Sequence, residues 1–178
     1  MIKKNNVQST IVKESIFIAM MILMEKKDFK EITITEVTKK AGVSRMSFYR
    51  HYSILEDVIN NYLDELFEDY SNAVAKNVHD YNKDSIRMFF AYFRKQERLV
   101  SNLIKSNLSH LILERCIEFF LSLSRNIVCD TGEFEDRGRY LIEFAAGGLY
   151  KVLIEWVKDG LKESDEKMAD ICYSLMRH

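Results

Sequence analysis

Hydrophobic residues recur along most of this chain at the spacing of amphipathic helices. From about residue 56 onward the apolar stripes advance in steps of three and four residues, which places their side chains on one face of a helix. The clearest stripes are Tyr62, Leu66, Tyr70 and Val74; Ile86, Phe89, Phe90 and Phe93; and Leu108, Ile112, Cys116, Phe119, Phe120, Leu123 and Ile127. Because proline is absent and glycine occurs only six times in 178 residues, long helices with short connections are favoured. The pattern predicts an all-α protein of about nine helices.

Two short helices joined by a tight turn are predicted over 34–40 and 45–51, after a longer helix over about 8–26. Thr33 and Glu36 have the spacing of a capping box, and Ser44 can cap the helix that follows the turn at Gly42. This is the pattern of a helix-turn-helix unit, whose second helix enters the major groove of DNA. Its small core is expected to consist of Ile16, Ala19, Met20, Leu23, Phe29, Val37, Ala41, Val43, Phe48 and Tyr52.

Charge is distributed unevenly between the two parts of the chain. The whole sequence has a net charge of −1, but residues 1–55 hold ten Lys and Arg against five acids, and residues 56–178 hold sixteen against twenty-two. A basic first third followed by an acidic remainder fits a small DNA-facing domain carried by a body that repels phosphate.

Other classes of protein find little support in the sequence. Cys116, Cys129 and Cys172 lie far apart, and the four histidines form no ligand pair, so we expect neither a metal nor a redox centre, and no cofactor. The odd number and wide separation of the cysteines also imply a reducing, cytoplasmic setting. The apolar run Ile16–Met24 is too short to cross a bilayer and predicts a mostly buried core helix, so no membrane segment is expected. An enzyme is disfavoured, because there is no nucleophile elbow or phosphate loop.

Several stretches in fixed register carry a family resemblance. They are Ile16-Phe17-Ile18-Ala19-Met20, Phe29, Ile32-Thr33, Ala41-Gly42-Val43-Ser44 and Phe48-Tyr49-Arg50-His51-Tyr52. In this order they resemble the DNA-binding region of the TetR (tetracycline-repressor) family of bacterial transcription regulators. The resemblance implies a three-helix helix-turn-helix DNA-binding domain over 1–55 and a helical regulatory and dimerisation domain over 56–178. It further implies a ligand-responsive regulator, most often a repressor, that binds a pseudo-palindromic double-stranded operator as a homodimer.

Candidate DNA contacts follow from this resemblance and from side-chain chemistry. Arg45 is the expected base reader, since a guanidinium can bond O6 and N7 of guanine together; the alternative is a solvated arginine at a helix start. Met46 and Ser47 lie beside it, and Phe48 and Tyr52 are expected in the core. The full set of expected DNA-binding residues is Thr33, Thr35, Lys39, Ser44, Arg45, Met46, Ser47, Tyr49, Arg50 and His51.

The second part of the chain carries two further expectations. The adjacent glycines at 147 and 148 suggest close approach of another backbone, in a partner chain or within the monomer, because each costs ~1 kcal/mol in a helix. The stretch Phe144–Leu149, with Trp156 after it, is similar to the penultimate helix of many TetR members, and this resemblance implies a dimer interface at Phe144, Gly147, Gly148, Val152 and Trp156. The family resemblance also implies a cavity for an unknown small-molecule effector, and its candidate lining residues are Tyr62, Phe67, Tyr70, Phe89, Phe93, Phe119, Phe120 and Phe144. The alternative is that these aromatic stripes are ordinary core. The candidate polar groups of the cavity are Asn107, His110, Arg115 and Glu143.

Departures from the family pattern leave a second function open. Asp28 stands where the family has glycine, Met46 where glycine is frequent, and Leu55 where a lysine usually contacts a phosphate. Loss of that lysine is expected to weaken salt-dependent, sequence-independent DNA binding. The alternative function is therefore a helical interaction protein or co-regulator of the same fold.

Overall fold

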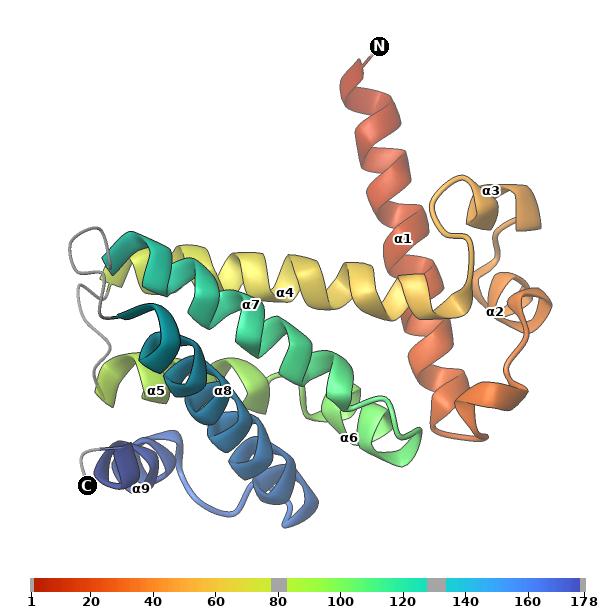
Figure 1. The fold of residues 1–178 in the computed structure, drawn as a ribbon. Coiled ribbons are helices and arrows are strands. Elements are labelled where there is room, and N and C mark those ends of the chain that lie inside the picture. The colour runs from red at the N-terminus through yellow and green to blue at the C-terminus, as the bar shows by residue number, and fades with distance from the viewer. Residues whose placement is uncertain (1, 78–82, 128–133, 177–178) are drawn as a thin grey trace. The chain divides into compact units, whose positions relative to one another are not determined.

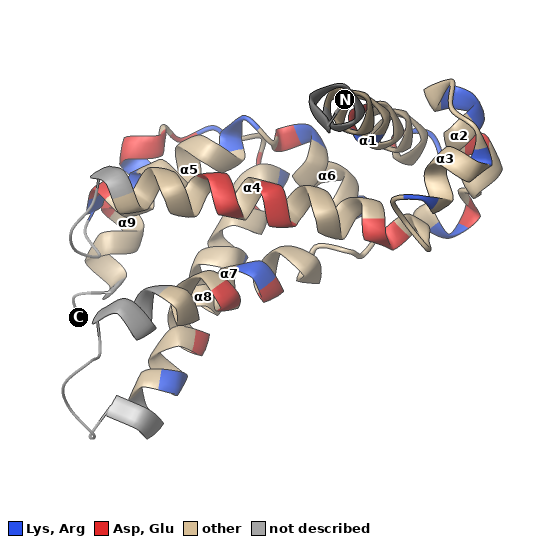
Figure 2. Cartoon of the chain, turned by 90° about the horizontal axis from the view of Figure 1, so that it is seen from above, with Lys and Arg blue, Asp and Glu red and all other residues tan. Residues whose placement is uncertain are grey.

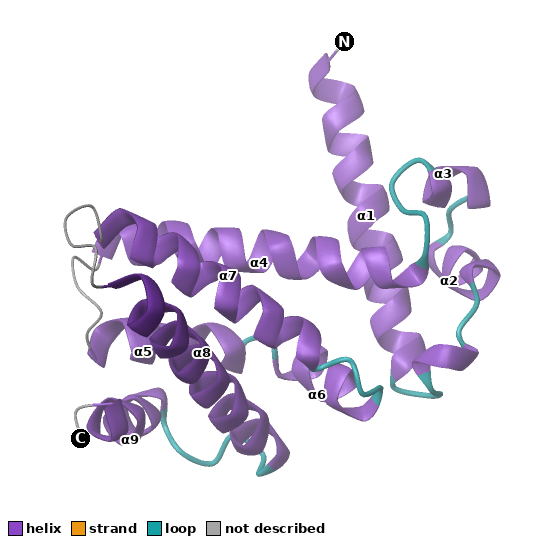
Figure 3. Cartoon of the chain, in the orientation of Figure 1, coloured by secondary structure: helices purple, strands orange, loops and turns teal. Residues whose placement is uncertain are grey.

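The computed structural model describes residues 2–77, 83–127 and 134–176. Within these ranges the chain forms nine α-helices and one short 3-10 turn, and no strand, which confirms the all-α prediction (Figure 1, Figure 3). The elements are α1 (Ile2–Met24), η1 (Phe29–Glu31), α2 (Ile34–Ala41), α3 (Arg45–Tyr49), α4 (Leu55–Asn77), α5 (Lys83–Arg94), α6 (Glu97–Lys105), α7 (His110–Ile127), α8 (Phe134–Lys158) and α9 (Asp165–Met176).

The chain divides into two compact units, Met1–Asp64 and Glu65–His178. The division falls within α4, whereas the functional boundary expected after residue 55 coincides with the start of that helix. The second unit contains the helices from α5 to α9, in which α5 packs against α9, and α7 and α6 pack against α8.

In the first unit, the buried face of α1 supplies the core that supports α2 and α3. Ile16, Met20 and Met24 are fully buried, as is Phe48 of α3. Leu23, which we expected in this core, is only half-buried, and Met21 and Met24 take the inward positions instead. Ala41 and Val43 are likewise half-buried.

Helix α1 starts six residues earlier than expected and ends two residues earlier. The amides of Lys26 and Lys27 both donate to the carbonyl of Leu23, at 3.0 and 3.1 Å, so the helix closes in a tight turn before the charged segment. By length and composition alone, the span Val7–Met24 could also cross a membrane, but core helices pass the same test. The burial of Ile16, Ala19, Met20 and Met24 identifies the second half of this span as such a core helix.

Candidate nucleic-acid interface

Helix α2 begins with the capping box that the sequence predicts. The hydroxyl of Thr33 accepts a hydrogen bond from the amide of Glu36 at 3.2 Å, and the Glu36 carboxylate accepts one from the Thr33 amide at 2.9 Å. Two backbone donors that the first helical turn leaves unpaired are thereby satisfied. This fixes the residue at which α2 starts.

Gly42 ends α2 and forms the turn to α3. Its φ of 69° lies in the left-handed region, where a side chain is strained. The Gly42 amide donates to the carbonyl of Lys39 at 3.4 Å and the Val43 amide to that of Thr38 at 3.0 Å, the two hydrogen bonds of a Schellman motif. The chain therefore reverses within two residues and starts α3 immediately afterwards.

Helix α3 has a side-chain cap at its N-terminus, and the buried Phe48 packs it onto the core of the first unit. The Ser44 hydroxyl accepts a hydrogen bond from the Ser47 amide at 3.0 Å. Phe48 is 0% exposed, and its ring lies 5.6 Å from that of Tyr52. The prediction that these two aromatics are core is confirmed. After Tyr49 the chain continues in a tighter turn, in which the His51 amide donates to the Phe48 carbonyl at 2.9 Å, so α3 is shorter than the expected 45–51.

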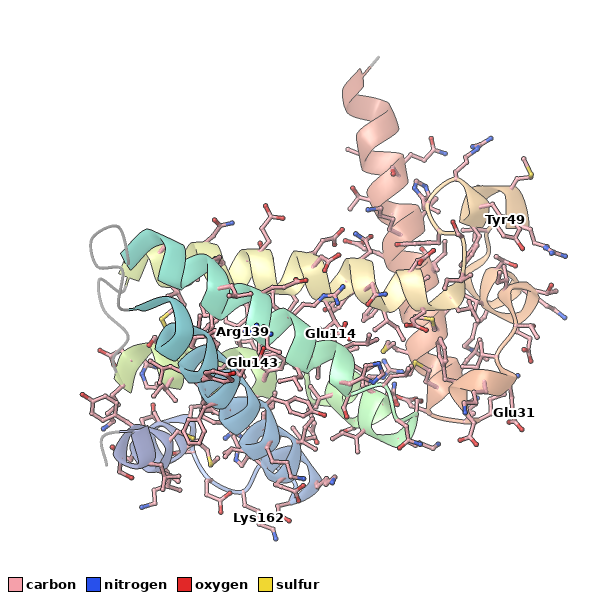
Figure 4. All side chains as sticks on the ribbon, in the orientation of Figure 1. Glu31, Tyr49, Glu114, Arg139, Glu143 and Lys162 are labelled. Atoms are coloured by element: carbon pink, nitrogen blue, oxygen red, sulfur yellow. The ribbon has the colours of Figure 1, made fainter. Side chains whose placement is uncertain are left out.

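The exposed face of α3 combines apolar and cationic side chains. Met46 is 68% exposed. Tyr49, labelled in Figure 4, is 48% exposed, so both side chains are accessible to a partner. Arg45 lies beside Tyr49: its Nη2 is 3.4 Å from the Tyr49 hydroxyl and its Cζ is 5.9 Å from the ring centroid. The guanidinium thus lies along the exposed surface of the helix, beside the Tyr49 ring.

All ten expected DNA-contact residues lie within α2, the turn and α3 with the residues just after it. Eight of them are exposed and two are half-buried; the exposed ones are Thr33, Thr35, Lys39, Ser44, Arg45, Met46, Tyr49 and Arg50, and the half-buried ones Ser47 and His51. Figure 2 shows that basic residues occur on this part of the chain, while acidic residues recur along α4. Some of the basic residues expected in the first third of the chain therefore lie on the helix-turn-helix, and the acidic remainder begins with α4.

Lys27 is a residue of this unit that the sequence reasoning missed. Its ammonium group donates to both carboxylate oxygens of Glu36, at 2.7 and 2.8 Å, and to the carbonyl of Glu31 at 2.7 Å. These hydrogen bonds, with those from Thr33, lower the pKa of Glu36 from 4.5 to about 2. No local spacing signals a contact between residues nine positions apart.

The start of α4 has a second unexpected feature. Leu55 stands there in place of the family's lysine, and the Asp57 carboxylate accepts hydrogen bonds from the amides of Ser53 and Ile54, at 2.7 and 3.0 Å. These two amides are therefore engaged by the protein itself, and a carboxylate at this place repels phosphate. Neither Leu55 nor Asp57 therefore offers a cation at the start of α4.

Six of the eight aromatics expected around an effector belong to one cluster in the second unit. The ring centroid of Tyr70 lies 4.9 Å from that of Phe119 and 6.1 Å from that of Phe89. Phe89 and Phe93 are 4.8 Å apart. Phe67 and Phe120 join the cluster through Phe93 and Phe119, and all six rings are buried. The Tyr70 hydroxyl donates to the Ser85 carbonyl at 3.1 Å, and burial raises the pKa of this phenol.

The other two aromatics lie elsewhere. Tyr62 belongs to the first unit, where its ring stacks on Phe17 at 3.7 Å. Phe144 is 74% exposed, so it does not line the interior of the second unit. Placing Phe144 in the interior was wrong, because α8 turns this position to the surface. Of the polar candidates, Asn107 and His110 are exposed and Arg115 is half-buried. Glu143, labelled in Figure 4, is exposed.

The residues expected at a dimer interface separate into two groups. Phe144 and Gly148 are exposed, and Gly147 and Val152 are half-buried. Trp156 is only 2% exposed and packs against Phe90 with ring centroids 5.2 Å apart, so it faces the core of its own unit. Twelve residues at ~100° each place Trp156 about 120° around the helix from Phe144, which is why the two do not share a face.

The fold and this site define a class of protein: a helix-turn-helix transcription regulator with a helical second domain. A family model for the C-terminal region of TetR transcriptional regulators matches residues 80–178, more than half of the chain. The chain therefore belongs to the TetR family of DNA-binding transcription regulators.

Solved structures of the same fold agree with this assignment. Lin0861 from Listeria innocua superposes with a TM-score of 0.79 at 14% identity, covering 96% of this chain and 92% of its own. A TetR transcriptional regulator from Streptococcus agalactiae gives 0.68 at 16% identity, with 98% of both chains covered. The TetR family repressor AlkX from a Dietzia species, implicated in the biodegradation of n-alkanes, gives 0.56 at 18% identity, covering 92% and 94%. At these identities the structures establish the shared fold.

Proposed function

We propose that this protein is a cytoplasmic, ligand-responsive repressor that binds a pseudo-palindromic operator as a homodimer. The observation that carries the proposal is the pairing of a buried Phe48 with an exposed Arg45, Met46 and Tyr49 on one short helix. One face of this helix is buried in the core, and its exposed face carries cationic and apolar side chains. Such a helix is suited to the major groove, where base edges offer hydrogen-bond acceptors and thymine offers a methyl group.

Roles on the DNA follow from the exposed chemistry of each side chain. We assign base reading to Arg45, with Met46 and Ser47 beside it. Phosphate contacts fall to Lys39, Arg50, Tyr49 and His51, because these groups donate hydrogen bonds without selecting a base. Thr33, Thr35 and Ser44 lie at or near the starts of α2 and α3, where helix N-termini favour anionic phosphate.

Self-association is supported by the exposed apolar residues of the second unit. Among its described residues, the large hydrophobic side chains that are exposed all belong to α8 or α9: Tyr140, Leu141, Phe144, Ile171 and Leu175. Large apolar side chains that are exposed on neighbouring turns of one helix, as Tyr140, Leu141 and Phe144 are on α8, can be covered by a partner. An atom added at Gly147 or Gly148 would meet nothing within 4 Å, so packing within the described part of the monomer does not require these glycines. This favours a partner chain as the reason for them.

The effector response is assigned to the buried aromatic cluster around Tyr70. Apolar walls with a few polar groups suit a small organic molecule. Such a ligand would favour one of two arrangements of the dimer and would shift the population away from the one that fits the operator. A cavity formed among these buried rings would accept a ligand that is mostly apolar and aromatic.

A gel shift against the region upstream of the protein's own gene tests the proposal. We expect specific binding at low salt that weakens steeply as salt is raised, because phosphate contacts release counterions. Deleting the gene is expected to raise transcription of the adjacent genes; a fall would identify an activator instead. Absence of binding at low salt would overturn the DNA-binding proposal.

Leu55 and Asp57 favour a second candidate function, a co-regulator that works mainly by binding another protein. Both reduce the affinity expected for the DNA backbone at the start of α4. A stable protein complex together with no DNA binding at low salt would support this alternative. Specific binding in the gel shift would exclude it.

A further inference from the structure

One arginine side chain joins three elements of the second unit. Arg94 is the last residue of α5, and its Nε donates to the Asp165 carboxylate at 2.7 Å. Its two terminal nitrogens donate to the carbonyls of Leu161 and Glu163, at 3.1 and 2.5 Å. Its Cζ also lies 4.6 Å from the centroid of the Trp156 ring. The guanidinium thus touches the last turn of α8, the connection to α9 and the first residue of α9.

The connection that Arg94 holds is conformationally strained. Gly160 and Leu161 have φ values of 80° and 56°, so two successive residues are left-handed, and the second has a side chain. The Leu161 amide donates to the Trp156 carbonyl at 2.9 Å, which ends α8 in a Schellman motif. Because the conformation of Leu161 is intrinsically unfavourable, external hydrogen bonds to this segment are needed to select it.

Helix α5 is also tied to α9 near its other end. Lys83, the first residue of α5, pairs with Asp170 of α9. Between these two ion pairs, α5 carries three buried aromatics, and Phe90 contacts the same Trp156 ring that Arg94 covers, at 5.2 Å between centroids. Phe89 and Phe93 belong to the aromatic cluster described above. A displacement of α5 would therefore move Arg94 away from the junction between α8 and α9.

We propose that Arg94 is a positioning residue that sets the geometry between α8 and α9, and thereby makes the self-association surface depend on the packing of α5. The inference rests on the proposed function, in which α8 and α9 form the surface for a second copy. Arginine is needed because its planar fork reaches three oxygen acceptors and stacks on an aromatic ring together. A lysine ammonium is a compact charge without a planar fork, so it cannot reach all three acceptors and also stack on the Trp156 ring.

Sedimentation equilibrium of the full chain, with far-UV circular dichroism as a check on folding, tests the inference. We expect Arg94→Met to raise the dimer dissociation constant by about tenfold or more while helix content is kept, within the range of typical coupling between sites. Arg94→Lys should give a smaller increase, because it retains the ion pair with Asp165. Arg87→Met removes a surface cation from the same helix and should stay within about twofold of the wild type.

A second pair of variants covers the case in which Arg94→Met does not fold. Asp165→Asn and Glu166→Gln each remove one acid from the first turn of α9, so their effects on the helix dipole are alike. Arg94 contacts Asp165, and we expect only Asp165→Asn to weaken the dimer. Equal effects of the two substitutions, or an unchanged dissociation constant in a folded Arg94→Met, would overturn the role of Arg94 but leave the proposed self-association standing. A monomeric wild type would overturn it together with the proposed self-association.

The dependence on α5 is tested separately, by the coupling between two substitutions in the dimer dissociation constant. A residue with a merely structural role would show no such coupling. Phe90→Leu and Arg94→Met are expected to act non-additively on the dissociation constant, because both act through Trp156. Additive effects would show that α5 packing and the junction are independent, contrary to the proposal.

Discussion

Lys27 and Glu36 join the end of the first helix to the first turn of the second, through two N–H···O contacts of 2.7 and 2.8 Å. The same carboxylate closes the capping box with Thr33. One acidic side chain therefore fixes both where α2 begins and how it is held against the segment after α1. Because α3 follows α2 after a turn of only a few residues, the orientation of the proposed reading helix depends on this pair.

The first prediction concerns the response of stability to acid. The pKa of Glu36 is lowered from 4.5 to about 2, chiefly by the hydrogen bond from Lys27. A carboxyl with a depressed pKa in the folded state stabilises the fold above its unfolded pKa. That contribution is lost as pH falls from about 4.5 to about 2. Urea unfolding at several pH values should show a shallower loss of stability over this interval in Glu36→Gln than in the wild type.

The control for this prediction is the partner residue. In Lys27→Met the main cause of the shift is removed, so the Glu36 pKa measured by carbon-13 NMR should rise toward 4.5. A Glu36 pKa that stays near 2 in this variant would contradict the assignment of the shift to Lys27.

The second prediction compares two neighbours on α3. Phe48 is 0% exposed and Met46 is 68% exposed. Phe48→Ala is expected to cost about 3–5 kcal/mol, because it leaves a cavity in the core of the first unit. Met46→Ala should change the free energy of unfolding by no more than ~0.5 kcal/mol, as for most surface substitutions. Chemical denaturation of the two variants measures both; similar losses would mean that the two side chains are not placed as described.

The third prediction concerns sequence discrimination on DNA. Arg45→Ala should reduce the preference for the operator over unrelated DNA by about 1–3 kcal/mol, the value of one bidentate contact with guanine. The fold should be unaffected, because Arg45 is exposed. Competition gel shifts against unrelated duplex measure the change. Lys30→Ala, which removes an exposed cation from η1, is the matched control and should retain the preference.

The fourth prediction is that Gly148→Ala has opposite effects on the monomer and on the dimer. Replacing glycine by alanine inside a helix stabilises it by ~1 kcal/mol, and the added atom meets nothing within 4 Å in this chain. If a partner helix approaches at this point, the same atom obstructs it. Thermal melts of dilute protein should shift upward while sedimentation shows weaker association. Unchanged association would remove Gly148 from the proposed interface.

Features set by adjacent residues were predictable from the sequence. The capping box at Thr33 and Glu36, the turn at Gly42 and the cap at Ser44 each depend on residues at most five apart, so local geometry decides them. The burial of Phe48 followed from its place on the apolar side of a short helix.

The sequence predicted less well which side chains of a long helix face the core. A stripe in steps of four drifts around a helix of 3.6 residues per turn, so Phe144 and Trp156 were assigned to one face although one is exposed and the other buried. Tyr62 was assigned to the second unit because α4 is continuous, and periodicity carries no information on where a long helix passes from one core to another.

The sequence by itself determined the all-α class, the helix-turn-helix and its family register, because caps, turns and apolar periodicity act over a few residues. Only the tertiary structure decided that Lys27 holds Glu36 and that Arg94 spans from α5 to Leu161, Glu163 and Asp165. Those partners are nine and about seventy positions apart in the sequence. Contacts at such separations are selected by the packing of whole helices, which brings side chains together wherever the buried faces happen to meet.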